Sequence, residues 1–303
     1  KFKKISLKKK NLVTLQDRID CYPSSVRSNL KKWVTKFGIK TNEISANSAE
    51  NGLMISRVFL QSHLTELRKY KEKNILADKL YGIPKNNLEL KNLKVAVPNN
   101  GYNNFFENFK KELNSQNIEV KFSSSIKPYY GKNKFTIKNF EELVETDKLV
   151  WTTNPTSLIK SSKVGELESK FIFVRMFCLN LDINLKENFY INIFSHKINI
   201  FRMYCYTLNG KSKITIECFK EQKDLNTVYK KINLIFSKFN IKLKLTKNQK
   251  FYSILQKRFF LTSVNDQKTL DNFYIKVKKS NVVHGAWEIY HREKKIDKIN
   301  NYL

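Results

Sequence analysis

The sequence lacks the short motifs that mark several common enzyme classes. It contains no GxSxG segment, which argues against the nucleophile elbow of the α/β-hydrolases. It contains no GxxxxGK[ST] loop, so a P-loop nucleotide site is not expected. It also lacks GxGxxG, the glycine-rich loop that opens a dinucleotide-binding unit. Its four histidines are isolated, and we therefore expect no metal site.

Long apolar runs and paired cysteines are also missing. No run of about 18 apolar residues occurs, so we expect no membrane span and a cytoplasmic protein. The basic start, Lys1–Lys4, leads into no apolar stretch of signal-peptide length. Cys21, Cys178, Cys205 and Cys218 form no CxxC pair, which favours buried thiols over disulfides or metal ligands. The first residue is not Met, and we expect the natural chain to be longer.

Acidic residues are few compared with basic ones. The 303 residues include 57 Lys and Arg against 27 Asp and Glu, a net charge of +30. Such a charge suits nucleic acid or an anionic membrane, because lysines bind phosphates by releasing counterions. The lysines are spread along the chain rather than gathered in a long arm, so we favour a solvated lysine surface and keep nucleic acid as the alternative partner. The 41% hydrophobic content suits one large or two ordinary globular domains.

The best-formed local pattern lies between residues 95 and 122. The apolar run Val95–Val97 stops at Pro98, and a turn of two Asn and a Gly follows. The segment Tyr102–Leu113 has apolar residues at helical spacing, and Ile118–Phe122 alternates apolar and polar residues. The pattern predicts a strand, a glycine turn, an amphipathic helix and a second strand, which together form a unit of an α/β sheet. The apolar face of the helix consists of Phe105, Phe106, Phe109 and Leu113.

Helices are also predicted in several other places. One runs from a Ser24 or Ser25 cap to about Phe37, and Gly38 ends it. A second pattern covers residues 52–80 and carries His63, which we interpret as a packed histidine rather than a ligand. A short helix is expected over residues 140–144, and an amphipathic one over residues 224–239.

Strands are predicted mainly in the middle of the chain. Four β-rich runs, at residues 171–181, 189–194, 200–207 and 213–219, favour an antiparallel sheet, and Asn209-Gly210 is a strong hairpin signal. A short apolar strand around Leu149–Trp151 emerges into a polar turn that Pro155 stops. Near the end, residues 281–284 form a strand and residues 288–303 a closing helix.

The order of these segments resembles the FAD-dependent amine oxidase-type proteins, such as the relatives of UDP-galactopyranose mutase and protoporphyrinogen oxidase. The segment 98–122 is similar to their return from the substrate domain to the flavin domain. Asp147–Pro155 resembles their "Asp, apolar strand, Thr/Ala, Pro" segment. The run Val174–Asp182, followed by Tyr190–Arg202, resembles their substrate-domain sheet with its aromatic–Arg pair, here Phe201-Arg202. Val282–Tyr290 resembles the C-terminal strand, glycine and helix that close over the flavin.

The resemblance implies an α/β (α+β mixed) fold, with a partial FAD-binding Rossmann-like sheet and an inserted substrate domain built on an antiparallel sheet plus helices. Residues 1–94 would be the helical part of the substrate domain, and residues 95–157 the return to the FAD-binding domain. Residues 158–278 would be the antiparallel-sheet substrate domain, and residues 279–303 the C-terminal strand and helix of the FAD-binding domain.

The resemblance also implies the cofactor and the site. FAD is the expected cofactor, and a flavin-dependent oxidoreductase or mutase acting on a small molecule, possibly a sugar nucleotide, is the expected activity. Because the flavin performs the chemistry in this family, no catalytic base is assigned. The implied cofactor contacts are Val120, Thr153, His284, Gly285, Ala286 and Trp287.

Some of the candidate site residues have a plainer alternative. Gly285 could simply make a tight strand-to-helix turn, with Trp287 packed in the core. Arg57 and Arg202 are candidate contacts for an anionic substrate, since Arg binds such groups bidentately, but a surface role is the alternative for both.

The sequence departs from the family in two ways. The N-terminal unit with GxGxxG is missing, and His284 stands where relatives often place an acidic or basic contact. The chain is therefore the C-terminal part of a longer protein or a decayed or split member, and we do not expect it to bind FAD by itself. A non-catalytic remnant or interaction module is the remaining hypothesis.

Overall fold

The structure is a computed structural model. It describes residues 12–46, 48, 53, 64–82, 98, 100–139, 142–168, 171–238, 251–285, 287 and 292–301. The account below concerns these ranges.

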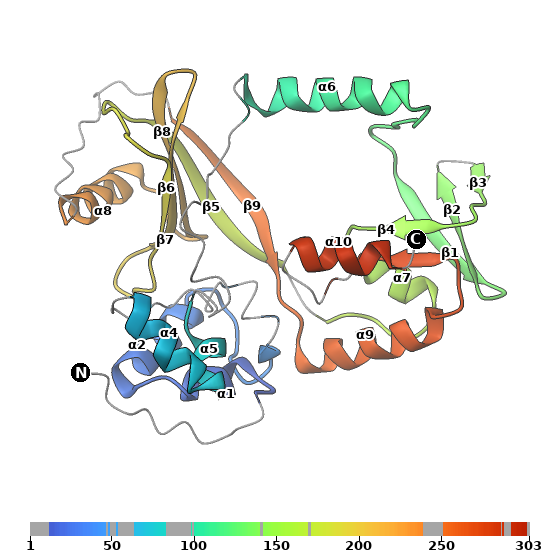
Figure 1. The fold of residues 1–303 in the computed structure, drawn as a ribbon, viewed down its shortest axis with the longest axis horizontal. Coiled ribbons are helices and arrows are strands. Elements are labelled where there is room, and N and C mark those ends of the chain that lie inside the picture. Colours follow the sequence, from blue (N-terminus) through green and yellow to red (C-terminus); the bar gives the residue numbers. More distant parts are fainter. Residues whose placement is uncertain are drawn as a thin grey trace.

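The N-terminal part is helical. It contains α1 (Leu15–Asp20), α2 (Ser24–Thr35), α4 (Leu64–Glu72) and α5 (Ile75–Leu80). These helices lie below a five-stranded sheet in Figure 1. They share one hydrophobic core with the near end of that sheet, in which Trp33 and Leu30 of α2 pack with Phe201 and Phe219.

The details of α2 confirm one prediction and correct another. Gly38 follows the helix with φ +70°, the left-handed conformation that glycine adopts readily. The residue at the N-cap position is Pro23, however, and no side chain caps the helix. The predicted Ser24 or Ser25 cap is wrong because the helix already begins at Ser24.

The helical pattern of residues 52–80 resolves into two helices in its described part. Asn74 stands between α4 and α5, and its side chain accepts a hydrogen bond from the backbone N–H of Ala77. Asn is a favoured N-cap residue, so α5 begins after Asn74 and α4 ends before it. His63 lies outside the described residues.

The middle of the chain forms an antiparallel sheet with the strand order β6-β7-β8-β5-β9. The predicted runs are confirmed as β5 (Phe171–Asn180), β6 (Phe189–Asn192), β7 (Ile200–Leu208) and β8 (Lys211–Phe219). Asn209 and Gly210 join β7 to β8 with φ +52° and +69°, as the hairpin signal predicts. The fifth strand, β9 (Tyr252–Phe260), was not predicted.

Helix α8 (Leu225–Ser237) covers one face of this sheet (Figure 1). Asp224 caps it by accepting hydrogen bonds from the N–H groups of Asn226 and Thr227. Its buried residues, among them Ile232 and Phe236, pack against Phe177 and Ile216 of the sheet. The amphipathic helix predicted for residues 224–239 is therefore confirmed.

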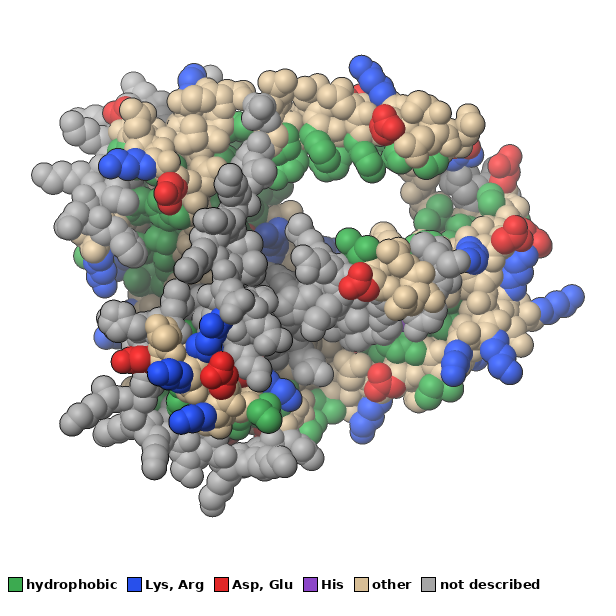
Figure 2. Space-filling view, in the orientation of Figure 1, with side chains coloured by type: hydrophobic (Ala, Val, Ile, Leu, Met, Phe, Trp, Pro, Cys, Tyr) green, Lys and Arg blue, Asp and Glu red, His purple; other side chains and the backbone are tan. Residues whose placement is uncertain are grey.

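Helix α6 (Gly101–Ser115) forms where the sequence predicts it, but no sheet of the described structure packs against its apolar face. None of its residues is buried, and Phe106 and Phe109 are 59% and 51% exposed. Figure 2 shows apolar side chains along its lower side, facing an opening in the molecule. The strand before it, Val95–Val97, lies outside the described residues.

The strand predicted at Ile118–Phe122 is wrong. This segment is an irregular connection from α6 to β1 (Ile126–Gly131), and Phe122 is 66% exposed. Alternation of apolar and polar residues makes a strand only where a partner strand is available. No strand of the described structure pairs with this segment.

Strand β1 continues into a small antiparallel sheet with β2 (Lys134–Asn139) and β3 (Glu142–Val144). The turn between β1 and β2 has Lys132 and Asn133 with positive φ, in agreement with the predicted turn. The short helix predicted for residues 140–144 is wrong, because Leu143 pairs with Lys138 of β2 instead. Pairing with a neighbouring strand has overridden a local apolar spacing.

The last part of the structure contains a parallel pair of strands, β4 (Leu149–Trp151) and β10 (Val282–His284). Helices α7 (Thr156–Ser161) and α9 (Val264–Val277) share a hydrophobic core with this pair, and α10 (Arg292–Asn300) closes the described chain. The side chain of Asn281 fixes the start of β10. It accepts from the Phe135 N–H at 2.7 Å and donates to the Phe135 and Thr146 carbonyls at 2.9 Å each.

The fold is thus mixed α/β with antiparallel sheets, and the predicted fold class is confirmed at this level. Helix α9 was not predicted. In the part of the chain that the structure describes, no helix combines the length and apolar character that crossing a membrane requires.

Candidate functional site

The candidate site lies where the two parallel strands end. Leu149 pairs with Val282 and Trp151 with His284, so both strands run in the same direction and finish at the same edge. Thr153 follows β4 and Gly285 follows β10. Two segments that are far apart in the sequence, and that both resemble the same family, therefore meet at this edge.

Gly285 allows the two chains to approach closely. A Cβ atom on Gly285 would lie 2.8 Å from the carbonyl oxygen of Trp151 and 3.0 Å from the Cα of Thr152. Both neighbours are backbone atoms, which cannot turn aside as a flexible side chain can. Backbone atoms at the end of β4 occupy the space where a side chain would lie. A glycine at position 285 therefore allows β10 to pack closely against β4.

Trp287 joins the two segments at this edge. Its indole N–H donates a hydrogen bond to the carbonyl oxygen of Thr153 at 2.6 Å. Its ring stacks on Tyr274 of α9, with ring centres 6.2 Å apart and planes 10° from parallel. The ring also lies 6.2 Å from Phe273. The plainer interpretation of Trp287, packing, describes these contacts.

His284 is buried in the same ring cluster. Only 6% of its surface is exposed, and its ring centre lies 4.3 Å from that of Tyr274. The ring centre of Trp287 lies 5.7 Å from that of His284, so the three rings contact one another.

A cleft of about 480 Å³ runs along β10 and the end of α9, next to His284. Its polar lining includes one acidic and two basic residues together with the hydroxyls of a tyrosine and a serine. These are Asp147, Lys148, Tyr274, Lys278 and Ser280.

The other implied cofactor contacts are not part of this group. Val120 lies in the irregular connection between α6 and β1 and is on neither strand of the pair. Ala286 and the candidate substrate residue Arg57 lie outside the described residues. Thr153, His284, Gly285 and Trp287 are the implied contacts that the structure brings together.

The second candidate substrate residue, Arg202, is buried rather than exposed. Its side chain is 2% exposed, and its Nε donates to Oε2 of Glu217 on the neighbouring strand at 2.9 Å. A second bond, from Nη2 to the same oxygen, makes this a close ion pair at 2.5 Å. The surface role that was the alternative for Arg202 is therefore wrong.

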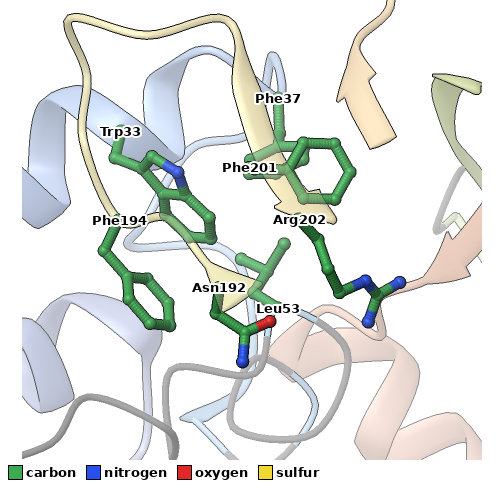
Figure 3. Close-up of a pocket in the computed structure, with 7 residues that line it drawn as sticks. All are labelled: Trp33, Phe37, Leu53, Asn192, Phe194, Phe201 and Arg202. Atoms are coloured by element: carbon green, nitrogen blue, oxygen red, sulfur yellow. The ribbon is translucent and has the colours of Figure 1, made fainter. Parts of the chain in front are cut away.

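Arg202 also lines a small cavity between α2 and the sheet (Figure 3). The interior volume of this cavity is about 10 Å³, room for about one water molecule. Most of its lining is apolar, and in Figure 3 the guanidinium of Arg202 points away from Trp33 and Phe194. The cavity is too small for a substrate.

Glu217 holds a second arginine. Nη2 of Arg258, on β9, lies 3.2 Å from Oε1 of Glu217, whose side chain is fully buried, and the Arg258 side chain remains 35% exposed. The Tyr204 ring on β7 lies under the Arg202 guanidinium, 5.0 Å from ring centre to Cζ. Burial, followed by the charge of Glu217, raises the pKa of the Tyr204 hydroxyl.

Sequence reasoning missed Glu217 and Arg258. One signal was present: Glu217 is an acidic residue within the run Ile214–Phe219, where every second position is apolar. A charged side chain in such a strand is rarely buried unless it is paired. Arg258 offered no comparable signal, because β9 itself was not predicted.

Among the residues that the structure describes, no three histidines, cysteines or carboxylates gather in a way that could hold a metal ion. The Lys and Arg side chains visible in Figure 2 are scattered over the surface shown, without a continuous basic stripe.

Comparison with known proteins gives little beyond this geometry. No family model matches the sequence, and no curated protein matches it. Among solved structures, the chain is similar to the "Crystal structure of Putative protoporphyrinogen oxidase from Exiguobacterium sp. 255-15", with a TM-score of 0.44 and 8% sequence identity. The alignment covers 66% of this chain and 49% of that one, so the matched region spans about half the length of that protein. A likeness of this size assigns neither a family nor an activity.

Proposed function

We propose that this chain is part of an FAD-dependent oxidoreductase or flavin-dependent mutase of the amine oxidase superfamily, acting on a small molecule. The sequence motifs support the proposal because they occur in the order that the family uses. In such a protein the antiparallel sheet and the N-terminal helices would contact the substrate, and the β4–β10 region would lie against the cofactor.

One observation carries the proposal. Two segments that resemble the family, Asp147–Pro155 and Val282–Tyr290, supply the paired strands β4 and β10, and both leave that pair at its carboxyl edge. Open α/β sheets bind their ligands outside the carboxyl ends of parallel strands. The edge that holds Thr153, Gly285 and Trp287 is therefore where a cofactor would lie.

The described residues fit one side of a flavin site. The Trp287 indole N–H binds the Thr153 carbonyl oxygen at the edge where a flavin would lie, and a flavin ring would contact this joined edge. The phosphates need more, because the sequence contains no glycine-rich loop to receive them. We therefore propose that a further segment or subunit supplies that loop. When bound, the flavin would supply the redox chemistry, and this chain's residues would position it and exclude water.

The pairing of β4 with β10 also supports the proposed division of the chain. Residues 95–157 and 279–303 would belong to the cofactor domain, because each contributes one strand of the pair. Residues 1–94 and 158–278 would form the substrate domain, because the N-terminal helices share a core with the five-stranded sheet. Helices α7 and α9 depart from this division, since they pack with the β4–β10 pair.

The test is to purify the full natural protein gently and record its visible absorption. The proposal expects a flavin spectrum and the release of FAD on denaturation. Absence of flavin, with no spectral change when FAD is added, would overturn it.

A pair of variants makes the test local. Trp287→Phe removes the N–H that binds the Thr153 carbonyl and should weaken FAD binding. Trp33→Phe is the matched control, since the Trp33 indole N–H is buried in the helical part without a hydrogen-bond partner in the described structure. The control should leave FAD binding by the folded protein unchanged.

A further inference from the structure

Strand β10 has the character of a central strand, although within the described ranges it pairs with β4 alone. Its residues Val282, Val283 and His284 are 7%, 4% and 6% exposed. Strands that are buried on both faces are typical of the interior of a parallel sheet, whereas edge strands are commonly protected by charged residues or proline. Because β10 contains no lysine, acidic residue or proline, its sequence suits a position between two strands.

The space beside β10 is open. All three residues of the strand line the cleft of about 480 Å³, together with Ile275 and Val277 of α9. The Ile275 side chain belongs to a residue that is 75% exposed, so an apolar group stands at this cleft with little to cover it. A cleft along a strand has the shape that an extended segment would fill.

The backbone of β10 has a hydrogen-bond acceptor on the side away from β4. The Leu149 N–H donates to the Asn281 carbonyl at 2.9 Å, which fixes the alternation of the ladder. Because successive residues direct their backbone groups to opposite sides of a strand, the Val282 carbonyl points away from β4. In the part of the chain that the structure describes, no group donates to this carbonyl, and Val282 is buried. A buried acceptor normally has a partner.

We infer that the cleft receives an extended apolar segment, which pairs with β10 as a third, parallel strand. The inference rests on the proposed function, because the occupant is the strand that precedes the glycine-rich loop of the cofactor site. A parallel strand on β10 ends at the edge that holds Gly285 and Trp287. The loop after that strand would therefore lie where the cofactor binds. In strand additions of this kind, main-chain hydrogen bonds give the affinity.

The test uses the 303-residue chain, which contains no GxGxxG loop of its own, and a fluorescein-labelled synthetic peptide. The peptide is Ser-Val-Ile-Val-Ile-Val-Gly-Ser-Gly-Ser-Ser-Gly, a β-branched apolar run followed by the loop. Fluorescence anisotropy measures its binding in the absence of flavin. We expect saturable binding, and a peptide that does not bind would overturn the inference.

A pair of variants locates the binding. Ile275→Lys should weaken peptide binding at least about tenfold, because a charged side chain replaces an apolar contact beside the added strand. Ile75→Lys is the matched control, since Ile75 is 73% exposed and lies on α5 in the N-terminal helical part. The control should bind the peptide as the wild type does. Equal weakening in the two variants would indicate a non-specific charge effect and overturn the inference.

Backbone pairing has a readout of its own, which apolar docking without pairing would not change. Two versions of the peptide carry N-methyl groups on alternate residues of the apolar run, so each lacks the N–H groups of one side of the strand. The version that lacks the N–H groups facing β10 should lose binding, and the other version should keep it. Equal affinities of the two versions would contradict strand pairing.

The result for the peptide is separable from the result for flavin. Peptide binding by this chain, with no flavin in the full natural protein, would keep the strand site on β10 and overturn the proposed function. Flavin in the full natural protein, with no peptide binding by this chain, would keep the proposed function and overturn the inference.

Discussion

Gly285 lies so close to Trp151 that a Cβ atom on it would be 2.8 Å from the Trp151 carbonyl oxygen. Gly285→Ala should therefore push β10 away from β4 and lower the free energy of unfolding by about 1–3 kcal/mol, the usual cost of overpacking. Chemical denaturation measures this loss in the free energy of unfolding.

The control for this prediction is Gly131→Ala. Gly131 has no atom within 4 Å of its Cβ position, and its φ is not positive. This substitution should leave stability unchanged or raise it by up to about 1 kcal/mol, by restricting the unfolded chain. Equal effects of the two substitutions would contradict the close approach at Gly285.

The buried ion pair of Arg202 and Glu217 predicts that replacing the carboxylate by an amide will strongly destabilise the fold. Glu217→Gln keeps the shape of the side chain but removes the carboxylate charge that faces the buried Arg202 guanidinium. We expect a loss of about 3–5 kcal/mol in the free energy of unfolding. Glu166→Gln breaks an ion pair with Lys160 whose partners are each 71% exposed, and should cost at most about 1 kcal/mol. Denaturant titrations measure both losses. Similar losses of stability in Glu217→Gln and Glu166→Gln would argue against a buried Arg202–Glu217 pair.

The cysteines should separate into two classes. Burial raises the pKa of the Cys205 thiol to about 12 and raises that of Cys218 further. At pH 8 both thiols should resist alkylation until the chain unfolds, whereas the partly exposed Cys21 and Cys178 should react in the native protein. Mass spectrometry of alkylated native and denatured protein counts the labelled positions. Rapid native labelling of Cys205 would contradict its burial.

The same pKa shift makes stability depend on pH. The unfolded thiol of Cys205 has a pKa near 9.0, so above that pH the unfolded chain loses a proton that the folded chain keeps. The stabilising contribution of the neutral thiol is complete below about pH 9 and is lost as the pH rises to about 12. Cys205→Ala should reduce this part of the pH dependence, which unfolding titrations at several pH values measure.

Because the apolar face of α6 is exposed, replacing a phenylalanine by alanine should cost less stability in α6 than in the hydrophobic core. Phe109 is 51% exposed, so Phe109→Ala should change the free energy of unfolding by no more than about 0.5 kcal/mol. Phe135 is fully buried, and Phe135→Ala should cost about 3–5 kcal/mol. A large cost at Phe109 would show that another part of the protein covers this helix.

The contrast between α6 and β9 shows what the sequence could and could not predict. The helical spacing of Phe105, Phe106 and Phe109 predicts the helix, but it cannot tell whether a partner covers the apolar face. Ile118–Phe122 alternates as a strand does, yet no strand within the described ranges pairs with it. Strand β9 has Ile254 and Leu255 next to each other, so its apolar residues do not alternate with polar ones in the pattern that indicates a strand.

The candidate site was likewise predictable from local patterns but not in its long-range contacts. The motifs place Thr153 and Gly285 at the ends of short apolar strands, and the observed pairing brings them together. The sharing of Glu217 between Arg202 and Arg258 was not predictable, because it depends on the order of β8, β5 and β9 in the sheet. Strand order is a long-range property that local spacing does not encode.

The most direct test of the central claim is the visible absorption spectrum of the gently purified full natural protein, followed by identification of any flavin that denaturation releases. The account predicts bound FAD in the wild type, weaker FAD binding in Trp287→Phe and unchanged binding in Trp33→Phe. A protein without flavin, whose spectrum does not change when FAD is added, would contradict it.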